Sequence, residues 1–307
     1  MTKGAARKDR HEPTSGRRFV PYAAALDLHT HTLRSDGVLT PEALVAAAGA
    51  AGVKLIAITD HDTLAGVREL RRSGAVPIGL EVLPGIELNS VLEEPGNAGE
   101  GEVHILGLGV DPDDDALEAA LSRQRDSRRV RFDRMVTRFR ELGMSLDEAL
   151  EDQPTTTDDD ALGRPRLARA LIARGYATSI EDAFTRHLSR GRPAYVPRQG
   201  LGPLDAIRAI RAAGGIASLA HFAEAPGHVP FIRELMAAGL NGLEVYYRSY
   251  EAPAVAGLRA VADELRLVAT GGTDFHGDRE TYAEAHSELW FPTPAADTFR
   301  AAVRIEV

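Results

Sequence analysis

Short apolar runs alternate with alanine-rich stretches along most of the chain. The apolar runs have the length expected of buried β-strands. They cover residues 23–28, 53–59, 77–85, 103–109, 215–219, 242–246 and 267–270. The stretches between them predict helices at 41–51, 64–72, 203–213, 230–238 and 253–264. The first helix shows clear boundary signals, since Thr40 can cap it, Pro41 suits its first turn and Gly52 follows its end.

This alternation predicts an α/β protein with a parallel sheet of about seven strands, either a barrel or a doubly wound sheet. The alternation stops at residues 111–197 (the insertion), which follow a different, purely helical pattern. Helices are predicted there at 116–142, as one long Arg-rich helix or a helix pair, and at 146–150, 166–174 and 180–190. Residues 21–110 and 198–307 would then form the main domain. Residues 1–20 are polar, lack the apolar centre of a signal peptide and are expected to be a disordered tail.

Composition narrows the chemistry that the chain can perform. It has 307 residues and no cysteine, so any metal must bind His, Asp or Glu side chains. The net charge of -9 argues against a long nucleic acid duplex as partner, but not against a small basic pocket for one or two phosphates. No apolar run approaches the ~18 residues that cross a bilayer, so we expect a cytoplasmic protein without membrane contact.

Titratable side chains gather at the ends of the first two predicted strands. Asp27, His29 and His31 recur with period two, which directs all three to one face of a strand. Two such imidazoles can bind one metal, although core or surface histidines are the alternative. Asp36 follows in a Ser-Asp-Gly sequence that also suits a simple turn. The second strand runs into Asp60–Asp62 (D-H-D), which is costly to bury unless it serves a site; a solvated turn is the alternative.

The later strands carry the same residue types. Glu87, His104, His221, Asp274 and His276 accompany the third, fourth, fifth and seventh predicted strands. Each could separately be a surface carboxylate or a satisfied core histidine. Together they are harder to explain in that way, because active sites of α/β barrels gather at the carboxyl ends of strands.

The strand ends thus hold nine candidate ligands for metal: His29, His31, Asp36, His61, Glu87, His104, His221, Asp274 and His276. Six of the ten histidines are among them, whereas the histidines at 11, 187, 228 and 286 lie in the tail, the insertion or loops. One metal needs three or four protein ligands, so nine indicate two or three divalent ions. Multinuclear His/carboxylate sites clamp phosphoryl oxygens and activate water near neutral pH.

At these positions the chain resembles the PHP (polymerase and histidinol phosphatase) phosphoesterases. The resemblance rests on D-L-H-T-H-T-x-x-S-D-G, I-A-I-T-D-H-D-T, P-G-I-E, V-H-I-L-G, L-A-H and T-D-F-H-G, and covers about residues 22–110 and 200–280. It implies a distorted (β/α)7 TIM-like barrel with the helical insertion as a substrate cap. It also implies a trinuclear site, often manganese and sometimes iron or zinc.

The resemblance further implies how the ligands divide among the metals. The first metal would bind His29, His31, Glu87 and Asp274. The second would share Glu87 and add His104 and His221. The third would bind Asp36, His61 and His276.

The insertion is similar to the branch that dephosphorylates nucleoside 3′,5′-bisphosphates or trims short 5′-phosphorylated RNA. By that similarity Arg164 and Arg192 would bind phosphate; surface arginines are the alternative. The chain has Arg166 and Phe222 where this branch usually has His and Pro. The first change replaces a side chain that could relay a proton with a fixed cation.

Our main hypothesis from the sequence is hydrolysis of a phosphate ester by a metal-bridging hydroxide, at the 3′-phosphate of a nucleoside 3′,5′-bisphosphate or at the 5′ end of a short RNA. Asp27 would orient a ligand histidine, and Asp62 or His228 would transfer protons. Alternatives are a histidinol-phosphate or other small phosphomonoesterase, and a non-catalytic metal-binding regulatory module. Amide hydrolysis is disfavoured, since it usually uses a modified lysine and Lys54 is the one lysine beyond the tail. The oligomeric state stays open.

Overall fold

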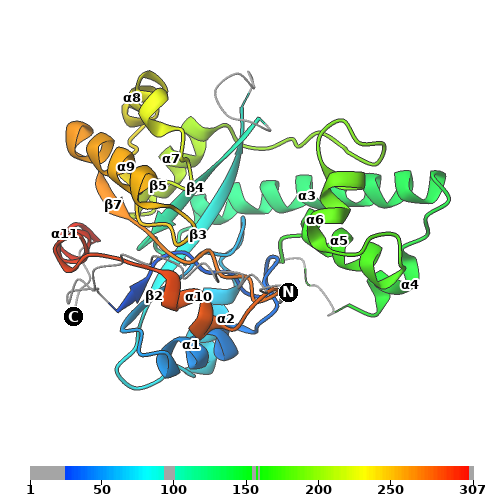
Figure 1. Cartoon of the computed structure of the whole chain (residues 1–307), viewed down its shortest axis with the longest axis horizontal. Coiled ribbons are helices and arrows are strands. Elements are labelled where there is room, and N and C mark those ends of the chain that lie inside the picture. The colour runs from blue at the N-terminus through cyan, green and yellow to red at the C-terminus, as the bar shows by residue number, and fades with distance from the viewer. Residues whose placement is uncertain (1–24, 93–100, 154–156, 158–159, 304–307) are drawn as a thin grey trace, which may run out of the picture.

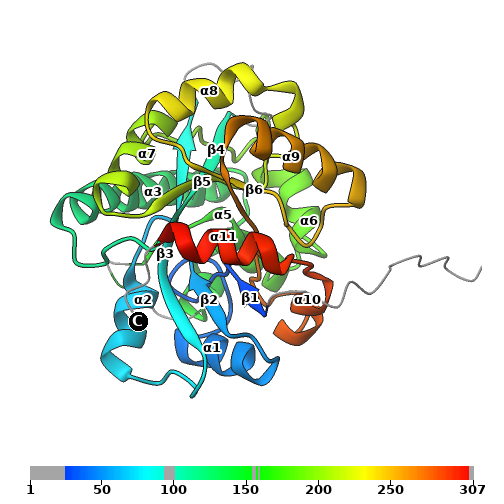
Figure 2. The ribbon, with the colours of Figure 1, turned by 90° about the vertical axis from the view of Figure 1, so that its left-hand side faces the viewer.

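The computed structural model describes residues 25–92, 101–153, 157 and 160–303; the predicted tail lies outside these ranges. Seven strands form one curled sheet in sequence order, with helices packed around it (Figure 1, Figure 2). The strands are β1 Leu26–Asp27, β2 Leu55–Ile58, β3 Glu81–Val91, β4 Glu102–Leu108, β5 Ile216–Leu219, β6 Gly242–Glu244 and β7 Val268–Thr270. The α/β fold class predicted from the alternation is confirmed.

The helices outside the sheet begin close to where the sequence signals place them. α1 spans Pro41–Ala50, and the Thr40 hydroxyl accepts a hydrogen bond from the backbone N–H of Ala43 at 3.2 Å. The others are α2 Ala65–Ser73, α7 Pro203–Ala212, the 3₁₀ turn η3 Ala225–Gly227, α8 Val229–Ala237, α9 Ala252–Leu265, α10 Tyr282–Glu288 and α11 Thr293–Val303. The last two were not predicted. Within the described ranges, each helix is too short or too polar to cross a bilayer.

β4 runs antiparallel to both of its neighbours, in a sheet that the alternation predicts to be parallel and that is parallel at its other strand pairs. Val91 pairs with Glu102 and Gly85 with Leu108 across the β3–β4 ladder. The physical reason is the short link between these strands, which cannot hold the helical crossover that parallel pairing needs. As a result the beginning of β4, which carries His104, lies at the same edge as the ends of the parallel strands.

β3 is longer than predicted, and Glu87 lies inside it rather than after it. Its first half pairs in parallel with β2 as far as Pro84, and its second half pairs with β4. The strand passes close to the end of β2, since a Cβ at Gly85 would lie 2.9 Å from the carbonyl oxygen of Ile58. This passage brings Glu87 opposite His61 in an isolated parallel bridge.

Backbone hydrogen bonds beyond the ends of β1 and β7 close the sheet. The N–H of Leu28 donates to the carbonyl of Gly271 at 3.2 Å, and the N–H of His31 donates to Phe275 at 3.0 Å. In return Asp274 donates to the carbonyl of His29 at 2.8 Å. The first and last strands are therefore joined, and the seven strands form the small distorted barrel that the resemblance implied.

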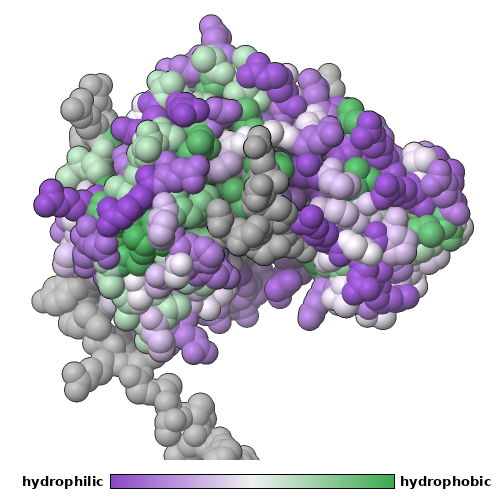
Figure 3. Space-filling model, turned by 90° about the horizontal axis from the view of Figure 1, so that it is seen from above, coloured by the Kyte–Doolittle hydropathy of each residue, from purple (hydrophilic) through white to green (hydrophobic). Residues whose placement is uncertain are grey.

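The insertion forms a second lobe beside the barrel. It holds α3 Asp115–Glu141, α4 Asp147–Glu151, α5 Arg164–Ala173, α6 Ile180–Ala183 and the π-helical turn η2 Phe184–Leu188. The stretch predicted as one helix or a pair is a single helix, α3. Leu117 and Leu121 pack into the barrel core, whereas Met135 and Phe139 belong to a separate core in the insertion. α3 joins the two lobes (Figure 1), and hydrophilic side chains dominate the visible face of the insertion in Figure 3.

Candidate metal centre

The nine side chains predicted as ligands converge at one edge of the barrel. They form three groups whose ligand atoms lie within 4.8 Å of one another, namely His31, Asp36, His61 and His276; His29, His31, Glu87 and Asp274; and His61, Glu87 and His104. His221 joins the third group, because its Nε2 lies 3.1 Å from Glu87 Oε1 and 3.1 Å from His104 Nδ1.

Glu87 lies at the centre of the cluster and is completely buried. Its Oε2 is 2.9 Å from His61 Nδ1 and 3.3 Å from the Nε2 atoms of His29 and His31. Its Oε1 is 2.8 Å from His104 Nδ1. A carboxylate with imidazoles around both oxygens can bridge two metal ions.

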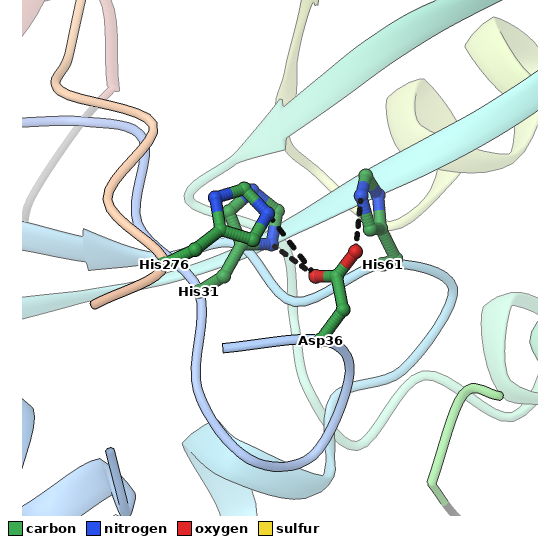
Figure 4. A group of neighbouring side chains, drawn as sticks. All are labelled: His31, Asp36, His61 and His276. Atoms are coloured by element: carbon green, nitrogen blue, oxygen red, sulfur yellow. Dashed lines mark ion pairs between the residues drawn. The ribbon is translucent and has the colours of Figure 1, made fainter. Parts of the chain in front are cut away.

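Asp36 forms one end of the cluster, on the loop that follows β1 (Figure 4). Its Oδ1 lies 3.2 Å from His276 Nε2 and 3.8 Å from His31 Nδ1, and its Oδ2 lies 3.5 Å from His61 Nε2. The three imidazoles converge on this carboxylate from the ends of β1, β2 and β7. The sequence-based alternative, a solvated turn aspartate, is excluded because Asp36 is buried.

The chemistry of the donor set fits metal ions. Several buried ligand atoms lie close to one another without the alignment of a hydrogen bond, and they have no hydrogen-bond partner among the described residues. They are His29 Nε2, both ring nitrogens of His31, Asp36 Oδ1, His61 Nδ1 and Glu87 Oε2. Buried polar atoms without partners are costly, and an exception needs a physical explanation. Divalent cations bound among these atoms would provide the missing partners, and His and carboxylate ligands suit manganese, iron and zinc.

The charges in the cluster are strongly coupled. Burial would raise the pKa of Glu87, but the surrounding imidazoles, those of His61 and His104 above all, hold it well below its usual range. Burial lowers the pKa of His61 to about 4, which leaves this ring neutral. For His276 burial is outweighed by Asp36 and Asp274, which raise its pKa to about 10. Metal binding would therefore displace a proton from His276, since ligand imidazoles are neutral.

The backbone is strained at this edge of the barrel. Asp62, His221 and Asp274 have positive φ angles of 51°, 30° and 51°, a region that non-glycine residues seldom occupy. A Cβ at Gly272 would lie 2.5 Å from the backbone nitrogen of His29. Only glycine permits this approach, which sets Asp274 beside His29.

Comparisons with known proteins identify the group to which this site belongs. The sequence profile of the PHP domain matches residues 27–184. The Escherichia coli protein named 5′-3′ exoribonuclease Rnm is 34% identical over 88% of this chain and 91% of its own length. A 3′,5′-nucleoside bisphosphate phosphatase from Chromobacterium violaceum is 33% identical over 84% of this chain and 89% of its own. The chain belongs to the PHP family.

Solved structures share the same architecture. A Bifidobacterium adolescentis protein described as a metal-dependent phosphoesterase superposes with a TM-score of 0.76 at 28% identity, over 90% of this chain and 96% of its own. A Chromobacterium violaceum amidohydrolase superposes with a TM-score of 0.72 at 29% identity, over 89% of this chain and 100% of its own. The fold, the family and the clustered ligands identify this PHP protein as a metal-dependent phosphoesterase.

The PHP site has a supporting contact at the end of β6, which the sequence analysis missed. Glu244 Oε1 lies 3.0 Å from His29 Nδ1, and its Oε2 accepts the backbone N–H of His221 at 2.6 Å. Asp27, which the sequence suggests as the residue that orients a ligand histidine, instead accepts the backbone N–H of His29 at 3.3 Å and hydrogen bonds from Thr273 and Tyr282. Glu244 therefore orients the ring, and Asp27 holds the loop of Asp274. A buried Glu inside G-L-E-V was the available signal.

The Asp62 carboxylate is paired with two arginines, an arrangement that does not suit the proton transfer predicted for it. Its side chain is completely buried, and its Oδ2 lies 2.5 Å from Arg128 Nε and 3.4 Å from Arg198 Nη2. Burial raises the pKa of Asp62, but the two guanidinium groups outweigh it and leave the pKa lowered. The carboxylate is thus an anchor between the barrel and the insertion. His228 begins α8 and packs against Phe222, with ring centroids 5.6 Å apart; its proton-transfer role stays a prediction.

Arginines from separate parts of the chain meet next to His104. Arg198 Nη1 lies 3.0 Å from Glu102 Oε2, at a position two residues before His104 on β4. Burial would raise the pKa of Glu102, but Arg198 and Arg164 lower this pKa to about 2, and Arg131 contributes to the effect. Arg164 belongs to this arginine group. Its other members, Arg131 and Arg198, were not predicted from the sequence. Arg192 is exposed, and its contact with phosphate stays a prediction.

Metal binding is expected to stabilise this protein. Excess chelator should lower Tm, and Mn²⁺ at about 100 times its Kd should restore roughly 2.7 kcal/mol, or about 5–10 °C. Differential scanning fluorimetry measures the shift. His29→Ala should reduce the shift, whereas His187→Ala, in the insertion, should preserve it. A Tm that no divalent ion changes would contradict the metal centre.

Proposed function

We propose that this protein hydrolyses the 3′-phosphate of nucleoside 3′,5′-bisphosphates and also cleaves short 5′-phosphorylated RNA from its 5′ end. The observation that carries the proposal is the arginine group (Arg131, Arg164 and Arg198) beside the metal centre. A substrate with two phosphates, one at the metals and one at the arginines, matches this arrangement.

The arginine group contains a buried hydrogen-bond donor that has no acceptor among the described residues. Arg131 donates through Nε to the carbonyl of Val196 at 2.8 Å, but its Nη2 is buried and has no hydrogen-bond partner among the described residues. Burial and the nearby Arg164 both lower the pKa of Arg131. Glu102 offsets part of this positive charge. A phosphate would supply the remaining acceptors, and guanidinium groups suit it because they donate in a planar fork.

Similar proteins support the same substrate class. The Chromobacterium violaceum relative is named a 3′,5′-nucleoside bisphosphate phosphatase, and the Escherichia coli relative a 5′-3′ exoribonuclease. The superposed Chromobacterium violaceum structure holds sulfate, a tetrahedral dianion that resembles phosphate. In our proposal both substrates place a 5′-phosphate at the arginine group and the bond that breaks at the metals.

We propose two or three metal ions, manganese in the first instance with iron or zinc as alternatives. His29, His31, Glu87 and Asp274 would hold the first, Glu87 with His104 and His221 the second, and Asp36, His61 and His276 the third. When bound, such ions supply positive charge to phosphoryl oxygens and lower the pKa of water. Glu244 keeps the His29 ring in place. The insertion (residues 111–197) would act as a substrate cap and brings Arg131 and Arg164 to the anchored phosphate.

Phosphate release from adenosine 3′,5′-bisphosphate with added Mn²⁺ tests the function. Arg131→Met and Arg164→Met should each raise KM for this substrate by about 10- to 100-fold, as expected when a charged hydrogen bond is removed. Neither should change hydrolysis of adenosine 3′-monophosphate, which lacks the anchored phosphate. Arg134→Met, which removes an exposed arginine of α3, serves as the control.

The possible outcomes separate the candidate functions. No release from any phosphate ester would refute the enzymatic proposal. Release from histidinol phosphate or a cyclic phosphodiester, but not from the bisphosphate, would retain the phosphoesterase class and refute the substrate. The cyclic substrate belongs in the panel because an Eggerthella lenta relative, 32% identical, is named a phosphoribosyl 1,2-cyclic phosphate 1,2-diphosphodiesterase.

A further inference from the structure

We propose that a second set of arginines, on the other side of the metal centre, binds the strand of a single-stranded oligonucleotide beyond the cleaved bond. This arginine track consists of Arg34, Arg68, Arg71, Arg72, Arg166 and Arg169. The inference rests on the proposed function, and it assigns a surface to the RNA substrate that a mononucleotide would not contact.

The track follows two cavities that share one residue. The inner cavity has a volume of about 330 Å³ and lies between the loop after β1 and helix α5, where Arg166 and Arg169 line it. The outer cavity has a volume of about 600 Å³ and lies over α2, where Arg68, Arg71 and Arg72 line it. Arg34 lines both cavities, which are therefore neighbours.

The inner cavity lies next to the metal centre. Ser35 and Gly37, which line it, flank the candidate ligand Asp36. Arg169 Nη2 donates to the backbone carbonyl of Asp36, while its buried Nε has no hydrogen-bond partner among the described residues. Burial and Arg169 lower the pKa of Arg166. Two neighbouring cations therefore lie next to the site, and the Nε donor of Arg169 is left for an anion.

The order of groups along the site matches the polarity of a strand. The arginine group with Arg131 lies beside His104, and Asp36 lies at the other end of the cluster, with Glu87 between them. A 5′-phosphate at the arginine group and a scissile phosphate at the metals would direct the following nucleotides past Asp36. The arginine track begins at this point.

Four arginines and two carboxylates, Glu69 and Asp113, line the outer cavity, and this excess of positive charge suits phosphodiesters. Arg71 pairs with Asp113 at 3.0 Å, but both side chains are more than half exposed, and such surface pairs hold their partners weakly. A phosphate can compete for these guanidinium groups and release counterions. Contacts of this kind hold a strand without reading its bases.

A length series of substrates tests the track. With Mn²⁺ present, KM is expected to fall from the 5′-phosphorylated RNA dinucleotide over the first few added nucleotides and then to level off. The double variant Arg71→Ala/Arg72→Ala should raise KM for the longer substrates severalfold, so that the fall of KM with length is lost. Its kcat should be unchanged. Hydrolysis of adenosine 3′,5′-bisphosphate should be unaffected. The slope of log KM against log salt should fall by about 0.7 for each phosphate that the variant no longer binds.

The control is the double variant Arg208→Ala/Arg233→Ala. Like Arg71, both arginines are more than half exposed and pair with an exposed carboxylate. They lie on α7 and α8, across the barrel from α2 (Figure 1, Figure 2).

The outcomes of this test separate the track from the proposed function. A bisphosphatase whose KM for RNA does not depend on length would overturn the track and leave the function intact. Equal effects of the two double variants would also overturn it, because the cause would then be overall charge. Absence of phosphatase activity in the unmodified protein would refute the proposed function itself.

Discussion

Glu87→Gln is expected to reduce phosphoesterase activity by about 10³-fold or more and to lower the metal content of the purified protein. The Glu87 carboxylate lies within 3.3 Å of a ring nitrogen of His29, His31, His61, His104 and His221. The substitution keeps the shape of the side chain but removes its charge and one acceptor oxygen. Loss of several kcal/mol of metal-derived stabilisation of the transition state corresponds to this change in rate.

The measurements are phosphate release and metal content by mass spectrometry. Glu81→Gln is a matched control, since Glu81 begins the same strand but pairs with Arg300 on the outside of the barrel. The control should retain both activity and metal. Full activity of Glu87→Gln would refute the bridging role of this carboxylate. A loss of activity with unchanged metal content would assign Glu87 to the chemistry rather than to metal binding.

Arg128→Met is expected to lower the free energy of unfolding by about 3–5 kcal/mol. It would leave the Asp62 carboxylate buried with only the more distant Arg198 as a counterion. Arg128 also donates to Asn89, whose side-chain amide contacts His104 at 2.5 Å. The change therefore breaks a buried polar network that joins α3 to the barrel. Urea unfolding followed by circular dichroism measures the decrease.

A double-mutant cycle isolates the ion pair from other effects. Asp62→Asn suits the positive φ at this position, because asparagine tolerates that region. The double variant Asp62→Asn/Arg128→Met should be destabilised by less than the sum of the single variants, by roughly 1–3 kcal/mol. Arg134→Met, on the exposed side of the same helix, should change stability by less than about 0.5 kcal/mol. Strict additivity would show that the pair contributes no coupling.

The sequence alone determined the fold class and the composition of the candidate site. The alternation of strands and helices is a local property, and so are Thr40 as a cap and Pro41 as a first helical residue. Period two directs the side chains of His29 and His31 to one face of the chain. Because barrel strands end at a common edge, ligand types that follow several strands could be expected to meet before any contact was known.

Only the tertiary structure decided which side chains contact one another at the site. The antiparallel course of β4 brings His104 to the site from the beginning of a strand, and β3 carries Glu87 inside its length. Glu244 rather than Asp27 contacts the His29 ring, and Asp62 is held by Arg128. Each of these outcomes depends on partners far apart in the chain. Local periodicity contains no information on such pairings, since packing of the barrel against the insertion selects them.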